Sequence, residues 1–548
     1  MSSSKTTVAK WLGLILVAAA IALSGCRSAA PPTPTIPPPA DPTVTNPATA
    51  SAAPTTQPPT TVPSDGFQPT IPTRTAAPPP AAVPPSTLFD LAWDDRSLFQ
   101  SGILDSEQGV LEQLPSASVY HLELVISDDL AHLDGRQEVY YTNQESASLE
   151  ELYFRLFPNL ADGTAVVFDL TINDQPATPE YELEQSAMRV PLTTPLLPGE
   201  HLVIAMNFAV DVPQDGGGNY GTFALMDNIL ALAHFYPMIP VYDDEGWNVE
   251  IAPEIGDVVY ADSSFYLVRV TAPAGLTLVA SGVETAREAQ DGRTTVTYAA
   301  GPVRDFYLVG SPDYTVISEQ VGATTINSYA PGGAAEGAQR ALTIAVDALT
   351  SYNERFGLYP FTELDVAATP TAAGGVEYPG IVVIGLRLYE NTGPASFFES
   401  ATAHEVGHQW FYSVIGNDQL DDPWLDEALT QYATAVYYGD VYGPTGEAGF
   451  WAAMQDRWDR VEGAAIPIGL PVSGYTALEY GAIVYGRGPL FFHTLAETMG
   501  QATFDAFLQD YYRTFKWGIV TPESLQELAE QHCVCDLTTL FEEWVYDQ

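Results

Sequence analysis

The sequence predicts a multidomain α+β protein in which an antiparallel, sandwich-like β domain precedes a mainly helical domain. Short runs of alternating apolar and polar residues, bounded by Gly, Pro and Asp, fill about residues 115–312. Such runs are typical of strands in a β-sandwich. After about residue 330 the apolar residues recur at helical spacing instead. We therefore expect an N-terminal β domain at 88–330 and a helical domain at 331–548.

Individual runs justify these two assignments. Residues 119–126, 265–270 and 293–298 alternate as strands do, and Asp291-Gly292 predicts a turn before the third run. The segment 333–356 carries apolar residues at helical spacing. Two short strands are expected at 364–368 and 381–384. From residue 397 onward we expect mainly helices, with turns at Gly416, Gly443 and Gly474.

The N-terminus has the features of a targeting segment. Lys5 and Lys10 precede an apolar stretch, 11–23, of about signal-peptide length. It ends in Leu-Ser-Gly-Cys26, which resembles the lipobox of bacterial lipoproteins and implies cleavage before Cys26 and attachment of lipid to it. An uncleaved amphiphilic anchor is the alternative. We expect residues 1–26 to be a lipoprotein signal peptide and the protein to be anchored at the extracytoplasmic side of the cell membrane.

Amino-acid composition identifies the segment after the signal peptide and excludes one class of binding partner. Residues 27–87 are rich in Pro, Thr and Ala, and such a segment is expected to be a disordered stalk. Asp and Glu number 69 against 20 Lys and Arg, a net charge of −49. This charge repels phosphate backbones, so we expect no nucleic-acid partner. Cys533 and Cys535 are either a local disulfide or two thiols. The sequence indicates no oligomeric state.

A pattern of metal-binding residues lies near the start of the helical region. His404, Glu405 and His408 form His-Glu-x-x-His, and on a helix positions i and i+4 share one face, so both imidazoles can reach one cation. Catalytic zinc takes a third protein ligand, and Glu427 follows His408 by nineteen residues, after a turn region. Glu405 is then placed to accept a proton from water on the metal. Two buried structural histidines are the alternative.

These residues resemble the gluzincin aminopeptidases of peptidase family M1, the aminopeptidase N and leukotriene A hydrolase type. The family signature is His-Glu-x-x-His, eighteen residues, then Glu within Trp-Leu-x-Glu, as in Trp424-Leu425-Asp426-Glu427. The resemblance implies a thermolysin-like catalytic domain, one Zn²⁺ per chain held by His404, His408 and Glu427, and peptide substrates. The chain stops where many relatives continue into a helical C-terminal domain, which we expect to be absent.

Two further segments extend the resemblance. Gly374-Gly375-Val376-Glu377-Tyr378-Pro379 is similar to the family's Gly-x-Met-Glu-Asn motif, whose Glu binds the substrate α-amine; this implies a substrate-binding role for Glu377, Gly374 and Gly375. Tyr485 in Tyr-Gly-Arg-Gly is similar to the tyrosine that stabilises the oxyanion, with Tyr480 as a nearby competitor. Many relatives add a Gln from the β domain to the amine site. That Gln is absent here, and Asn228 is a loose substitute.

The function that these features favour is removal of N-terminal residues from peptides outside the cytoplasm, by zinc-activated water with Glu405 as general base. Three alternatives stay open. A zinc endopeptidase would lack amine recognition, an epoxide or small-ester hydrolase could reuse the zinc and Tyr485, and a surface lipoprotein could bind ligands on the same scaffold without catalysis.

Overall fold

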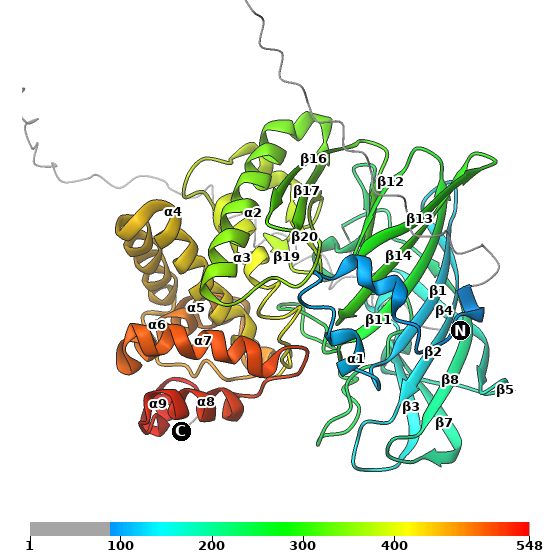
Figure 1. The fold of residues 1–548 in the computed structure, drawn as a ribbon, viewed down its shortest axis with the longest axis horizontal. Helices are drawn as coiled ribbons and strands as arrows, with labels where there is room; N and C mark the ends of the chain where they lie inside the picture. Colours follow the sequence, from blue (N-terminus) through cyan, green and yellow to red (C-terminus); the bar gives the residue numbers. More distant parts are fainter. Residues whose placement is uncertain (1–87, 217, 547–548) are drawn as a thin grey trace, which may run out of the picture. The chain divides into compact units, whose positions relative to one another are not determined.

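The computed structural model describes residues 88–216 and 218–546. The predicted signal peptide with Cys26 and the predicted stalk at 27–87 lie outside these residues. Within the described ranges, none of the helices combines the length and the apolar character that crossing a bilayer requires. Strands dominate the first part of the described chain and helices the last part, which confirms the predicted multidomain α+β class (Figure 1).

The largest sheet has eight strands in the order β13-β14-β11-β1-β2-β8-β4-β5. Its central strand β1 pairs antiparallel with β2 and parallel with β11, and Val119 lies opposite Phe265 in the parallel pair. In chain order the strands are β1 Val119–Ile126, β2 His132–Thr142, β4 Thr164–Ile172, β5 Gln175–Pro176, β8 His201–Asp211, β11 Ser264–Pro273, β13 Val283–Gln290 and β14 Arg293–Val303. The three runs predicted as strands are confirmed, as is the turn at Asp291-Gly292.

Two smaller sheets complete the β-rich half. A three-stranded sheet has the order β3-β7-β6, and a four-stranded sheet the order β12-β15-β10-β9. Their strands are β3 Leu149–Arg155, β6 Glu180–Glu182, β7 Ala187–Leu196, β9 Phe223–Met226, β10 Ile229–Leu232, β12 Thr277–Ala280 and β15 Leu308–Ser311. The short helix α1, Val110–Gln113, lies in the segment before β1, and Trp93 of the same segment stacks on His121 of β1 with ring centroids 4.3 Å apart.

A five-stranded sheet with the order β16-β17-β18-β20-β19 begins the second half. It consists of β16 Tyr314–Val321, β17 Thr324–Pro331, β18 Glu363–Thr369, β19 Gly375–Val376 and β20 Ile381–Gly385. The predicted strands at 364–368 and 381–384 are confirmed. The domain boundary at residue 330 stays a prediction, and the sheet has strands on both sides of it. Because β19 is the last strand, one of its edges is free of strand pairing among the described residues.

Helices pack beside this sheet and gather on the side away from the long strands β1, β2 and β8 (Figure 1). The helix predicted at 333–356 is observed as α2, Ala335–Arg355. The remaining helices are α3 Phe397–Gly407, α4 Trp424–Trp458, α5 Ala477–Ala482, α6 Gly488–Met499, α7 Gln501–Phe515, α8 Pro522–Cys533 and α9 Thr538–Trp544. The turn expected at Gly443 is a bend inside α4, where Gly443 takes φ +67° ahead of Pro444. That φ favours glycine, so the helix changes direction there.

A buried arginine joins the β-rich half to the loop after α3. Arg304 is 2% exposed, and its guanidinium group donates to the carbonyls of Tyr412 (2.7 Å), Ala261 (3.0 Å), Val414 (3.3 Å) and Gly518. A Cβ on Gly416 would lie 2.1 Å from the guanidinium carbon, so the absence of a side chain there makes room for it. This arginine seam fixes the loop that follows the two histidines of α3.

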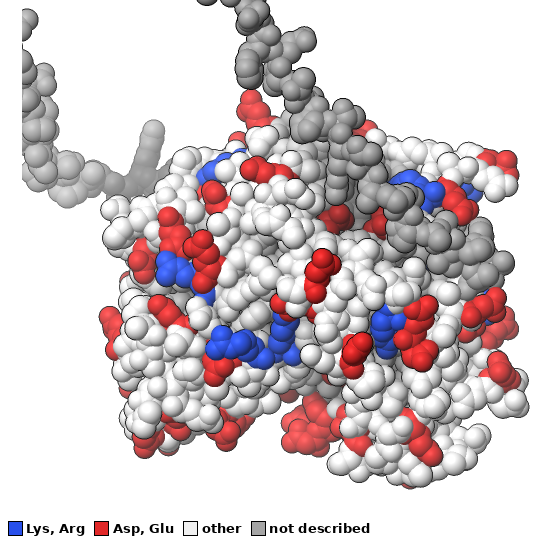
Figure 2. All heavy atoms as spheres, in the orientation of Figure 1, with Lys and Arg blue, Asp and Glu red and all other residues white. Residues whose placement is uncertain are grey.

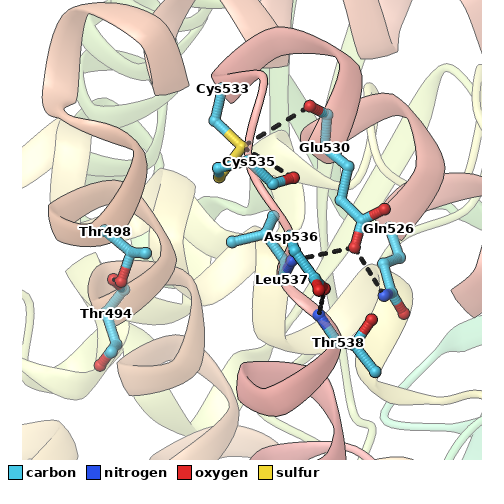
Figure 3. Close-up of a disulfide and its surroundings, with 9 residues drawn as sticks. All are labelled: Thr494, Thr498, Gln526, Glu530, Cys533, Cys535, Asp536, Leu537 and Thr538. Carbon is cyan, nitrogen blue, oxygen red and sulfur yellow. Dashed lines mark hydrogen bonds between the residues drawn. A yellow bond between two sulfur atoms is a disulfide. The ribbon is translucent and has the colours of Figure 1, made fainter.

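The surface and the C-terminal turn complete the description. Acidic side chains outnumber basic ones on the face shown in Figure 2, as the composition of 69 against 20 requires. Cys533 and Cys535 form a disulfide at the end of α8 (Figure 3). Beside it, Glu530 accepts hydrogen bonds from Gln526 Nε2 (3.0 Å) and Leu537 N (2.9 Å), which ties α8 to the start of α9. Of the two states that the sequence left open, the structure has the disulfide.

Candidate active site

Helix α3 presents the two histidines, and its own ends fix its position. The Ser396 side chain accepts a hydrogen bond from Glu399 N and caps the first turn. The Tyr352 hydroxyl donates to Ala403 O at 3.0 Å, one residue before His404. A Cβ on Gly407 would lie 2.9 Å from the Thr430 side chain, so the missing side chain lets α3 approach α4 closely. This contact brings His404 and His408 to Glu427, near the start of α4.

The three predicted metal ligands converge on one point. Nε2 of His404 lies 2.9 Å from Glu427 Oε2 and 3.0 Å from His408 Nε2, and His408 Nε2 lies 3.3 Å from Glu427 Oε2. All three side chains are buried, and their ligand atoms lie within 4.8 Å of one another. Tetrahedral zinc with bonds of about 2.1 Å would separate its ligand atoms by about 3.4 Å. The donor set and its spacing therefore fit a zinc ion.

Neighbouring groups orient one of these ligands. Nδ1 of His408 lies 2.9 Å from the Phe411 carbonyl and 3.2 Å from Thr430 Oγ1. A proton on Nδ1 that donates to the carbonyl leaves Nε2 with its lone pair directed at the metal position. Nδ1 of His404 has no partner among the described residues. Burial and the neighbouring His408 lower the pKa of His404 to about 4, so this imidazole is neutral, as a ligand must be.

Glu405 faces the edge strand across the cavity. A Cβ on Gly375 would lie 2.4 Å from Glu405 Cγ, so only glycine at this position allows β19 to pass so close to the carboxylate. Burial raises the pKa of Glu405 well above its ordinary value. The side chain is placed beside the metal position without being one of the three converging ligands. Its location fits a base that exchanges a proton with water or substrate.

Glu377 follows β19 and is held by two glutamines. Gln419 Nε2 donates to Glu377 Oε1 at 3.0 Å and to Asp426 Oδ2 at 2.8 Å. Gln409, next to His408, accepts from Gly380 N at 2.9 Å and donates to Tyr378 O at 3.2 Å. Burial raises the pKa of Glu377. The segment after the edge strand is thus fastened to α3, and a buried carboxylate that receives one protein hydrogen bond can accept more from a ligand.

Tyr485 reaches the metal position from a single π turn, Ile483–Arg487. Its hydroxyl donates a short hydrogen bond to Glu427 Oε1, the oxygen that does not face His404. Tyr480 also lines the cavity, but its hydroxyl has no partner among the described residues, and the two rings are 5.6 Å apart. The structure therefore places Tyr485, rather than Tyr480, in contact with a predicted metal ligand.

One cavity of about 450 Å³ is lined by most of the site residues described above, although not by His408: His404, Glu405, Glu427, Glu377, Tyr480 and Tyr485. The β-rich half contributes Tyr220 and Asp257 to its wall, two residues that sequence reasoning missed. Burial in the wall and the nearby carboxylates of Glu377 and Glu427 raise the pKa of Asp257. Asn228, the loose candidate for amine recognition, instead donates to Asp313 on the exposed surface at 3.0 Å. The predicted site residues come together, apart from Asn228.

Comparison with known proteins agrees with this arrangement. Residues 340–544 match the peptidase family M1 domain. The chain is 24% identical over 301 residues to aminopeptidase 2 of Candida albicans and 26% identical over 220 residues to aminopeptidase N of Lactococcus lactis. These matches cover 52% and 37% of this chain, and 32% and 26% of the relatives. The chain thus spans about a third of the length of the curated relatives it matches.

Comparison with solved structures shows the same fold over a larger fraction of this chain. The chain is similar to the M1 zinc metallopeptidase of Deinococcus radiodurans, with 22% identity, a TM-score of 0.58, and coverage of 82% of this chain and 95% of that one. A variant of the same enzyme bound to a Tyr-Ser-Ala substrate matches with 21% identity, a TM-score of 0.58, and coverage of 79% and 94%. At this identity the likeness shows the fold.

Proposed function

The chain belongs to peptidase family M1 through residues 340–544, and on this basis we propose that it is a zinc-dependent aminopeptidase that removes N-terminal residues from peptides. The observation that carries the proposal is one cavity lined by His404 and Glu427, which converge with His408, and by the buried side chain of Glu377. A metal site alone would fit any hydrolase of this fold. A buried carboxylate beside it, at the end of a free strand edge, supplies a counter-charge for a peptide's α-ammonium group.

One Zn²⁺ per chain would be held by His404, His408 and Glu427. Zinc, when bound, supplies a Lewis acid that polarises a substrate carbonyl and acidifies water. Glu405 accepts the proton of the attacking water and passes it to the leaving amine. The Tyr485 hydroxyl donates to the oxygen of the scissile carbonyl as negative charge develops there. Both side chains line the cavity at the metal position, as these roles require.

Substrate recognition combines backbone and charge. The free edge of β19 offers backbone N–H and C=O groups at Gly375 that can pair with an extended peptide, while the carbonyl of the preceding Gly374 accepts from Gly385 N at 3.0 Å. Glu377 binds the α-ammonium group, and Gln419 holds its carboxylate in place. Asp257 supplies a second carboxylate from the β-rich half, in the role that a glutamine fills in many members of the family. Binding of an N-terminal residue between two carboxylates explains why cleavage would begin at that end.

Known relatives support peptides as the substrate class. The D. radiodurans enzyme that shares this fold has been solved with a Tyr-Ser-Ala substrate, and the matching relatives from C. albicans and L. lactis are aminopeptidases. We extend the proposal to location on sequence grounds alone. The lipobox-like segment ending at Cys26 supports a lipid anchor at the membrane, with the described domains on the extracytoplasmic side.

The test uses peptide pairs that differ only in a free or acetylated N-terminus, with the wild-type chain and a Glu377→Gln variant. We expect the wild type to cleave only the free-amine peptide. Loss of one charge-assisted contact in Glu377→Gln should lower kcat/KM for that peptide by about 10-fold to 100-fold. Equal cleavage of free and acetylated peptides by the wild type would identify an endopeptidase and remove the assigned role of Glu377.

A further inference from the structure

A second hollow of about 710 Å³ opens from the far side of the active-site cavity. It lies between the start of α3 and the second half of α4, beyond the bend at Gly443. The two hollows share four lining residues: Phe397, Ser400, Arg457 and Arg460. They are therefore neighbouring parts of one groove that passes the metal position.

The direction of a bound peptide along this groove follows from the edge strand. With its α-amine at Glu377, an extended peptide runs antiparallel to β19, from Glu377 toward Gly374. Gly375 lies against Glu405, so the scissile bond is expected at that level. At Gly374 a Cβ would lie 2.9 Å from the Phe397 ring, at the entrance to the second hollow. Since a strand advances about 3.3 Å per residue, we expect the second hollow, which Phe397 and the two arginines line, to receive the first or second residue after the cleaved bond.

Arg457 and Arg460 have no carboxylate partner in the structure. Neither forms an ion pair or a side-chain hydrogen bond within residues 88–216 and 218–546. Burial and the neighbouring Arg460 lower the pKa of Arg457, and the carboxylate of Glu427 acts in the opposite direction. Arg457 is half-buried, whereas Arg460 is exposed. An arginine cannot lose its proton, so the unpaired, half-buried charge of Arg457 is costly. A ligand with negative charge would remove that cost.

The position of Arg457 is fixed by close packing. A Cβ on Gly486 would lie 3.0 Å from both Arg457 Cβ and Trp458 N, so the turn that carries Tyr485 lies directly against this part of α4. Arg487, in the same turn, shows the contrasting case. It donates to the carbonyls of Ile466 (2.7 Å), Trp544 (2.8 Å) and Glu543 (2.9 Å), and so serves the fold. Arg457 lines both hollows and makes no such bonds.

We propose that Arg457 and Arg460 bind the terminal carboxylate of short peptides, so that the enzyme prefers dipeptides and tripeptides with free C-termini. The groove is then negative where the α-amine binds and positive where the carboxylate binds, which matches a zwitterionic peptide. In a chain with a net charge of −49, such a positive pair has to act locally, since the overall field repels anions. The proposal rests on the aminopeptidase function and assigns its substrate class.

The test compares kcat/KM for Ala-Ala-Ala with that for its C-terminal amide. We expect the wild-type chain to prefer the free acid by about tenfold, the effect of one charge-assisted contact. In the double variant Arg457→Gln/Arg460→Gln the ratio should fall to about one. Arg457→Lys/Arg460→Lys should keep part of the preference. The control is Arg513→Gln, which removes one positive charge from an exposed arginine on α7 that lines neither hollow and should leave the ratio unchanged.

The possible outcomes distinguish failure of the carboxylate site from failure of the proposed aminopeptidase function. Cleavage of both peptides at equal rates by the wild type, or a preference unchanged in the glutamine double variant, would overturn the carboxylate site while leaving the aminopeptidase intact. No cleavage of either peptide would overturn the function and the inference together. If the glutamine double variant does not fold, the wild-type ratio of kcat/KM and the lysine double variant still test the carboxylate site. For a hexapeptide and its C-terminal amide, whose C-termini lie beyond the arginines, the ratio of kcat/KM should be near one.

Discussion

Two arginines in this protein, one buried and one half-buried, differ in whether their guanidinium groups are hydrogen-bonded. In the arginine seam, Arg304 is almost completely buried and donates to four carbonyls, which join the β-rich half to the loop after α3. In the wall of the groove, Arg457 is half-buried and has neither ion pair nor side-chain hydrogen bond within the described residues. Both guanidinium groups carry the same charge, and burial lowers the pKa of both.

This difference in hydrogen bonding distinguishes a charge that stabilises the fold from one that is available to a ligand. A buried cation with its hydrogen-bond donors satisfied by backbone acceptors stabilises the fold, and its removal leaves those acceptors unpaired. A cation that lines a cavity with its donors free lowers stability until a ligand arrives. Substitutions in the seam should therefore change stability, and substitutions in the groove should change activity.

The largest effect is expected in the groove, at Glu405. Glu405→Gln removes the proton acceptor and leaves the size of the side chain nearly unchanged. We expect kcat for a free-amine peptide to fall by about 10³-fold or more. Because the variant also removes a buried carboxylate, the thermal unfolding midpoint should not fall. If the variant stayed active, or lost activity because it unfolds, the idea that groove substitutions change activity and not stability would be contradicted.

The next effect is expected in the seam. Arg304→Met fills a similar volume but leaves the carbonyls of Tyr412, Ala261 and Val414 without their donor. We expect the free energy of unfolding to fall by about 3 kcal/mol. Arg457→Met, the matched control, should change it by less than about 1 kcal/mol, because no protein hydrogen bond is lost. Urea unfolding of both variants provides the measurement, and equal losses would contradict the contrast.

A smaller effect is expected at Asp257, the carboxylate that the β-rich half contributes to the groove. Asp257→Asn keeps the shape and removes the charge, so KM for free-amine peptides should rise by about tenfold. Asp244→Asn, an exposed residue in the same connecting segment, makes the same charge change and should leave KM unaltered. Steady-state kinetics on both variants check this, and an unchanged KM for Asp257→Asn would exclude its role in amine binding.

The last effect, comparable in free energy to that at Asp257, concerns a buried base, His121, which can lose its charge as arginine cannot. Burial and nearby Arg96 lower the pKa of His121 to about 4, so the folded protein keeps this imidazole neutral. Between pH 4 and 6.5 the unfolded chain binds the extra proton, and stability therefore falls as the pH falls through this window. From pH 7 to pH 5 the loss should be about 1–2 kcal/mol. In His121→Gln the loss should be smaller by this amount, as measured by urea unfolding at both pH values.

Much of the metal site could be predicted because its information is local. His404, Glu405 and His408 lie within one helical turn and a half, where the period of the helix determines which side chains share a face. Glu427 was predictable from its spacing to His408 and from the Trp-Leu-x-Glu pattern that contains it. The strand at 119–126 and the helix α2 were predictable from periodicity, which depends only on neighbouring residues.

The rest of the groove depends on contacts between distant segments. Asp257 lies in a segment without regular secondary structure, and only the packing of the β-rich half on the loop after α3 brings it to Glu377. Gln419 is one of several polar residues in a turn, and its bond to Glu377 has no sequence pattern. Arg457 looks like an ordinary residue near a helix end; only the bend at Gly443 and the close contact at Gly486 place it beside the metal position.

Zinc-dependent aminopeptidase activity is tested most directly by a mass-spectrometric time course of one free-amine decapeptide, incubated with the zinc-loaded chain and with the chain after chelation. We expect a ladder of products shortened one residue at a time from the N-terminus, with no products after chelation and recovery when one equivalent of Zn²⁺ is restored. Internal cleavage, or the same ladder from the chelated protein, would contradict this expectation.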